Sequence, residues 1–127
     1  MKSLFQDRNK ALLIVFLSLL SCSKKDVDYN QLLGSWKMKD VVNSTGQDIS
    51  EKTTYYKNGT AISVIKVDNK VNEVIKFKYA INKEKNTFRL SYQNYSKEFS
   101  IEKLNKNEFD LKDLETSRII RNIRVKD

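Results

Sequence analysis

The stretch Glu73-Val-Ile-Lys-Phe-Lys-Tyr-Ala-Ile81 alternates apolar and polar side chains over most of its length, with a period of two residues. Phe77 and Tyr79 fall on one face together with the flanking isoleucines, whereas Lys76 and Lys78 fall on the other. This alternation predicts a β-strand with one buried face and one solvated face. Because the apolar face of this strand needs neighbouring strands to bury it, the segment predicts a β-sheet.

Four segments with the same alternation follow toward the C-terminus, at residues 87–92, 98–104, 108–114 and 117–125. Polar turns rich in Asn and Lys precede two of them. In the last segment, alternation groups Arg121 with Ile119, Ile123 and Val125 on the inward face.

Three less regular strands are expected toward the N-terminus, at residues 35–42, 53–57 and 60–67. The pair Asn58-Gly59 is typical of a two-residue hairpin turn, because both residues tolerate positive φ. Before these strands, residues 28–33 predict one helical turn with Asp28 as its N-cap, ended by Gly34.

Short strands joined by turns at nearly even spacing predict an all-β antiparallel barrel or sandwich. We expect an up-and-down barrel of about eight strands, since closure removes the sheet edges that otherwise invite aggregation. The chain has 127 residues, which suits one such domain.

The N-terminus has the features of an export signal. Lys2, Arg8 and Lys10 precede an apolar run at residues 11–20, which is too short to span a bilayer as a helix. Leu19-Leu20-Ser21-Cys22 resembles the bacterial lipobox, which implies cleavage before Cys22 and a lipid anchor on its thiol. We therefore expect a signal peptide at 1–21, a lipidated Cys and tether at 22–28, and the barrel at 29–127.

The residues after Cys22 bear on the location of the protein. Ser23-Lys24-Lys25-Asp26 is similar to the charged segment that follows the lipidated Cys in Bacteroidota lipoproteins. That resemblance implies a place in the cell envelope, at the outer membrane, with display on the cell surface as an expectation.

The mature chain resembles the lipocalin-like (calycin) barrels at Leu33-Gly34-Ser35-Trp36, where a short helical turn leads into Gly-x-Trp. Thr53–Thr60 and the alternating segments after it are similar to small secreted lipocalin-like domains of Bacteroidota. The resemblance implies that Trp36 plugs the closed end and that an Arg of the last strand packs across it. Arg121 and Arg124 are the two candidates, and alternation favours Arg121.

The residue types that the chain lacks exclude several chemistries. It has no His and a single Cys, so it can form neither an intrachain disulfide nor a zinc site built from several His or Cys ligands. Ser-His and Cys-His nucleophilic mechanisms are excluded as well. There is no Gly-rich phosphate loop and no recognisable pair of acid/base carboxylates. We therefore expect neither an enzyme nor a bound cofactor or metal.

Two functions remain in competition. In the first, the barrel holds a small apolar or amphipathic ligand, with these candidate contacts: Tyr56, Phe77, Tyr79, Phe88, Tyr92 and Phe99. The same aromatic side chains could instead simply fill the core. In the second function, a filled barrel binds a protein or glycan through its surface.

The net charge is +8, but the Lys residues are spread along the chain, as on an ordinary solvated surface. Such a surface could still favour an acidic partner, in binding that weakens with salt. Nucleic acid is not expected, because export removes the domain from it.

Overall fold

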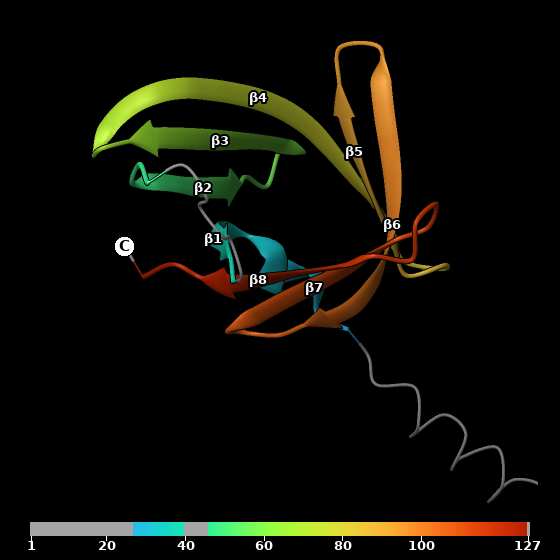
Figure 1. Ribbon diagram of the computed structural model, residues 1–127. Helices are drawn as coiled ribbons and strands as arrows, with labels where there is room; N and C mark the ends of the chain where they lie inside the picture. The colour runs from blue at the N-terminus through green and yellow to red at the C-terminus, as the bar shows by residue number, and fades with distance from the viewer. Residues whose placement is uncertain (1–26, 40–45, 127) are drawn as a thin grey trace, which may run out of the picture.

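The computed structural model describes residues 27–39 and 46–126. In these residues the chain forms a closed antiparallel barrel in which the strands β1 to β8 pair in chain order and β8 pairs back with β1 (Figure 1). The expected all-β up-and-down barrel of eight strands is confirmed.

A short 3-10 turn precedes the barrel, and the strands follow one another through short connections. The bounds are η1 Tyr29–Leu32, β1 Gly34–Met38, β2 Ile49–Tyr55, β3 Thr60–Val67, β4 Lys70–Asn82, β5 Thr87–Tyr92, β6 Tyr95–Leu104, β7 Glu108–Asp113 and β8 Ile119–Arg124. Strands β3 and β5 have the bounds expected from alternation. Strands β2 and β6 begin earlier than expected.

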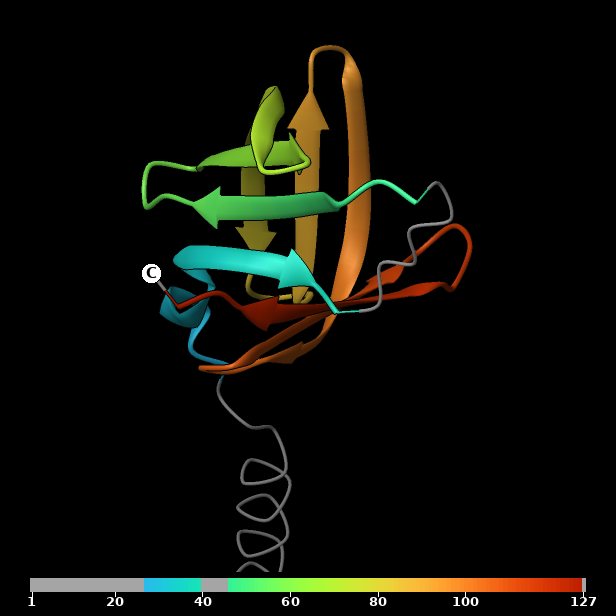
Figure 2. The same ribbon diagram turned by 60° about the vertical axis from the view of Figure 1, so that its left-hand side comes forward.

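The two ends of the barrel differ. At one end, called here the closed end, lie the start of β1 and the turns after β2, β4 and β6, and η1 lies beside the turn after β4, where the hydroxyl of Tyr29 donates to the side-chain oxygen of Asn86 at 2.9 Å (Figure 2). The opposite end, called the open end, carries the turns after β3, β5 and β7. As expected, the Asp28 side chain caps η1 by accepting a hydrogen bond of 3.1 Å from the backbone N–H of Asn30. Gly34 ends the turn with φ +113°.

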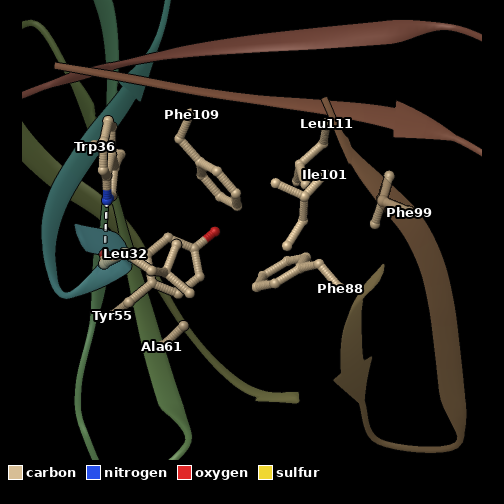
Figure 3. Close-up of a cluster of buried hydrophobic side chains, with 9 residues drawn as sticks. All are labelled: Leu32, Trp36, Tyr55, Ala61, Phe88, Phe99, Ile101, Phe109 and Leu111. Carbon is tan, nitrogen blue, oxygen red and sulfur yellow. Dashed lines mark hydrogen bonds between the residues drawn. The ribbon is translucent and has the colours of Figure 1, made fainter. Parts of the chain in front are cut away.

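The half of the barrel next to the closed end is filled by aromatic side chains (Figure 3). Trp36, Phe88 and Phe109 are fully buried. Phe109 touches the other two, with ring centroids 5.6 Å from Trp36 and 5.5 Å from Phe88, and Tyr55 packs edge-on against Phe88 at 5.7 Å. Edge-to-face contacts are a favourable arrangement for aromatic rings, so these rings form a well-packed layer.

The turn between β2 and β3 differs from the expected two-residue hairpin. Tyr56 N–H donates to the oxygen of Thr60, so three residues lie between them. Only Gly59 in this turn has positive φ, at +84°, while Asn58 accepts the N–H of Thr60 with its side-chain oxygen. A turn of two positive-φ residues occurs instead between β3 and β4, at Asp68 and Asn69.

The facing of β8 is the reverse of that expected. Phe109 and Leu111 of β7 point into the core, and their partners in β8 are Asn122 and Ile120. Because paired residues in an antiparallel sheet lie on the same face, Ile120, Asn122 and Arg124 point inward. Arg121 pairs with Asp110 and is exposed on the outer face.

Strand β4 is the longest strand, and it changes neighbours along its length. It pairs with β3 from Lys70 to Lys78, but with β5 only from Lys78 to Asn82. Figure 1 shows β4 curving away from the β5–β6 hairpin. Among the described strands, β4 therefore has a sheet neighbour on one edge only near the open end.

Candidate functional site

Trp36 and Arg124 form the plug of the closed end. The indole of Trp36 is 1% exposed, and its N–H donates a hydrogen bond of 2.8 Å to the backbone oxygen of Leu32. The guanidinium carbon of Arg124 lies 4.0 Å from the centroid of the Trp36 rings. At this distance the cation is attracted to the face of the ring, and it also shields the ring from water.

Arg124 also ties three separate backbone segments together. Its Nη1 donates to the oxygen of Leu33 at 2.6 Å, its Nη2 donates to the oxygen of Gln31, and its Nε donates to the oxygen of Lys106 at 2.9 Å. Partial burial lowers the pKa of Arg124 from its usual range. The expected preference for Arg121 as the partner of Trp36 is therefore wrong, and the second candidate, Arg124, makes the contact.

The half of the barrel next to the open end is lined differently from the closed half. Several large side chains that lie on inward-facing strand positions are only partly buried here: Ile65, Ile75, Phe77, Leu90 and Tyr92. Tyr92 is 42% exposed, whereas Phe88, four residues earlier on the same face of β5, is 0% exposed. Solvent thus reaches the inner wall of the open half but not that of the closed half.

Polar groups also face inward between the aromatic layer and the open end. Thr53 and Ser63 are buried partners across β2 and β3, with their hydroxyl oxygens 2.6 Å apart. The hydroxyl of Thr53 donates to a carboxylate oxygen of Glu51 at 2.7 Å. Ser63 then donates to Thr53, so a chain of hydrogen bonds runs along the inner wall.

Across the barrel, Lys97 and Asp113 form an inward-facing ion pair with 2.5 Å between Nζ and Oδ2. The hydrogen bond from Lys97 holds the pKa of Asp113 below its usual range, and the same bond raises the pKa of Lys97. Asp113 also accepts the backbone N–H of Glu115 at 2.9 Å, which fixes the turn after β7. The pair is therefore charged at neutral pH and held in place.

The phenol of Tyr55 is buried in the core of the barrel. Its ring belongs to the aromatic layer, and its hydroxyl points toward the middle of the barrel near Phe88 and Phe109 (Figure 3). Burial raises the pKa of Tyr55 above its usual range, and the charge of Glu51 adds to this. The hydroxyl is therefore neutral and can both donate and accept a hydrogen bond.

The six aromatic residues expected to contact a ligand fall into three groups. Phe88 and Phe99 are buried in the core, and Tyr79 packs on it, with its hydroxyl bonded to the backbone oxygen of Tyr56. Phe77 also packs against the core, and it forms a pair with Tyr92 of the open half, with ring centroids 5.6 Å apart. Tyr56 lies in the β2–β3 turn at the closed end, away from that pair.

The inward polar residues were not among the expected site residues. Glu51 and Thr53 share the inward register of Tyr55, so extending the alternation of β2 could have found them. In the strand at 60–67 the apolar pattern predicts Ile62 and Val64 as the inward residues, which is wrong, because Ala61 and Ser63 face the core. Cys22 lies outside the described residues. Within residues 27–39 and 46–126, no group of three or more Cys, Asp or Glu side chains is placed to hold a metal ion. No helix in this part of the chain is long and apolar enough to cross a membrane.

The outer surface of β2, β3 and β4 carries a second candidate site. We call it the basic face, defined by the outward-pointing residues Lys52, Lys66, Lys76 and Lys78 with Ile62, Val64 and Val74 between them. Among the described residues of these three strands, Glu51 and Glu73 are the acidic ones, and both occupy inward positions. The basic face therefore combines positive charge with apolar side chains.

Comparisons with known proteins bear on the fold. The structure is similar to that of a protein from Bacteroides uniformis solved by NMR, with a TM-score of 0.64, 18% sequence identity, and coverage of 80% of this chain and 94% of the other. No protein-family model matches the chain, and no curated protein matches its sequence. At this identity the similarity supports the shared barrel fold alone.

Proposed function

We propose that the protein is a lipid-anchored envelope protein with a lipocalin-like barrel that binds a small apolar or amphipathic molecule in its open half. The observation that carries this proposal is the contrast between the two halves of one barrel. The closed half is packed with buried aromatic side chains, whereas inward-facing residues of the open half, such as Phe77 and Tyr92, remain accessible to solvent.

The chemistry of the open half favours an amphipathic ligand. Its wall offers aliphatic and aromatic side chains, as ligand sites usually do, and its inner side offers a few fixed polar groups. The Lys97–Asp113 ion pair supplies such groups. An apolar tail would lie against Phe77 and Tyr92, and a polar head would reach these groups.

Titration with an environment-sensitive apolar dye, followed by displacement with a medium-chain fatty acid, tests this function. We expect saturable binding that Tyr92→Ala weakens about tenfold, because the ring supplies a large apolar contact. Tyr56→Ala is the matched control, since Tyr56 is 45% exposed, close to the 42% of Tyr92, but lies at the closed end. Binding that does not saturate, or equal effects of the two variants, would refute ligand binding in the open half.

The anchor is proposed from Cys22 and the residues around it. Acylation on one thiol and on the new N-terminus would supply more than one chain, which is what stable membrane attachment requires. Cys22→Ser should abolish metabolic labelling with palmitate and release the protein from the membrane fraction. A variant that still carries label would overturn the anchor.

A second function, binding of an acidic partner, is favoured by the position of Lys66, Lys76 and Lys78 on one outer face of the sheet. The triple variant K66Q/K76Q/K78Q should elute from immobilised polyglutamate and from heparin at lower salt than the unmodified protein. The control K85Q/K106Q/K126Q removes the same charge from exposed lysines that are not on the basic face. If both variants elute at equally lowered salt, net charge alone explains the binding, and the second function is refuted.

A further inference from the structure

The free edge of β4 near the open end is an incomplete sheet. Pairing between β4 and β5 stops at Lys78 and Ser91, while pairing between β4 and β3 continues to Lys70. Phe77 and Tyr92 still touch just beyond the last pair, and there the two strands part. In Figure 1 the β5–β6 hairpin stands clear of the curved N-terminal part of β4.

The alternation of an antiparallel ladder identifies the backbone groups on this edge. Tyr79 donates its N–H to the oxygen of Gly59, on the β3 side. Odd-numbered residues from Glu73 to Phe77 therefore bond toward β3, and the even-numbered Val74 and Lys76 direct N–H and C=O toward the free edge. Such groups form a ready template for another strand.

A cavity of about 370 Å³ lies at the point of parting. Thr60, Lys76, Phe77 and Lys78 line it from β3 and β4, and Ser91 and Gln93 line it from the β5 side. The cavity therefore adjoins the free edge and is large enough to receive side chains of a strand laid along that edge.

The charged side chains along the free edge of β4 determine which kind of strand can pair with it. Lys76 and Lys78 are exposed, and neither lies in an ion pair with another described residue. Pairing of two β4 edges would bring the lysines of both copies onto one face, where like charges repel. An acidic strand from a different protein would instead be attracted to these lysines.

We propose that the free edge of β4 binds an extended acidic segment of a partner protein as an additional β-strand. This proposal names the partner of the basic face and so rests on the second function above. The added strand would hydrogen-bond to Val74 and Lys76. Its outward side chains would lie beside Lys76 and Lys78, and its inward side chains beside Ile75 and Phe77. The preferred segment therefore alternates acidic and apolar residues.

Fluorescence anisotropy with short labelled peptides and the full-length chain purified in detergent tests the proposal. A peptide alternating Glu and Val should bind at least about tenfold more tightly than one with the same residues in two blocks, and than one alternating Lys and Val. N-methylation of the peptide nitrogens facing β4 should abolish binding, whereas methylation of the alternate nitrogens should not.

Two measurements on the protein locate the bound strand. In the free protein, the amide hydrogens of Val74 and Lys76 should exchange faster than those of Ile75 and Phe77, and the peptide should slow the first pair selectively. Val74→Pro removes a donor from the free edge and leaves the β3 ladder intact, so it should weaken peptide binding at least about tenfold. If this variant does not fold, the exchange pattern and the methylated peptides still decide the question.

The outcomes separate the two proposals. If blocked and alternating acidic peptides bind equally and the exchange of Val74 is unchanged, strand addition is overturned while the acidic-partner function stands. If K66Q/K76Q/K78Q and its control have equal effects and no acidic peptide binds, both fail. If the Lys-Val peptide binds best, the edge is used but the charge argument is wrong, and the proposal as stated is overturned.

Discussion

Replacement of Arg124 by Ala should destabilise the barrel far more than replacement of Arg121. Arg124→Ala removes three hydrogen bonds to the backbone oxygens of Gln31, Leu33 and Lys106 and the contact with Trp36. Each bond contributes roughly 1 kcal/mol net, because water can replace part of it, and the cation–π contact adds about 1 kcal/mol. Allowing for relaxation, we expect a loss of about 3 kcal/mol.

Thermal unfolding can measure this loss through Trp36, because it is the single Trp of the chain. For a domain of this size, about 3 kcal/mol lowers Tm by roughly 12–24 °C. The emission of Trp36 should also shift to longer wavelength in the folded state, since water then reaches the ring.

Arg121→Ala is the matched control, because Arg121 is exposed on the same strand and pairs with Asp110 on the outer face. It should change stability by at most about 0.5 kcal/mol. Arg124→Lys should fall between the two, because one ammonium group cannot reach all three oxygens. A loss for Arg121→Ala equal to that for Arg124→Ala would refute the assignment of the plug.

Three further perturbations test the core, the first strand and the inner ion pair. Phe109→Ala should cost about 3–5 kcal/mol in urea unfolding, because the ring is 0% exposed and touches the aromatic layer; a cost below about 1 kcal/mol would contradict this. Gly34→Ala should lower Tm measurably, because φ is +113° and a Cβ would lie 2.6 Å from Nη1 of Arg124; an unchanged Tm and Trp emission would count against it. Asp113 has a lowered pKa in the folded state, so its contribution to stability is present above its unfolded pKa and is lost as pH falls through the folded value. Asp113→Asn should therefore flatten the decline of Tm on acidification below about pH 4. Lys97 has a raised pKa in the folded state, so its contribution to stability should be lost only as pH rises through that folded pKa.

The strands that could be predicted are those with unambiguous alternation. Strand β5 has Phe88 and Leu90 on one face and Arg89 on the other, and its predicted bounds are correct. At strand β8 the local apolar pattern favours the wrong one of the two facings, because Ile119, Ile123 and Val125 share one face while Ile120 is the only apolar residue on the face that points inward. The pairing with β7 decides between them, and a contact between strands is not contained in the local pattern.

Alternation predicts which residues of the candidate site face inward, but it does not predict how far along the barrel each one lies. Phe88 and Tyr92 share a face of β5, but four residues separate them, about 13 Å along the strand. One therefore lies in the packed half and the other at the open end, a difference that alternation does not record. Ser63 could not be predicted because the apolar residues Ile62 and Val64 favour the opposite facing of β3. Thr53 is a polar residue whose burial depends on its pairing with Ser63.

With the proposed lipid anchor, the position of η1 determines which end of the barrel would face the bilayer. Val27 and Asp28 lie at the closed end, beside Lys106 and the β6–β7 turn. With Cys22 acylated as proposed, four residues lie between the anchor and Val27, so the two are at most roughly 18 Å apart. The barrel would then stand with its plug toward the lipid headgroups and its opposite mouth toward the aqueous side. A ligand or a partner strand would approach from that side without competing with the membrane.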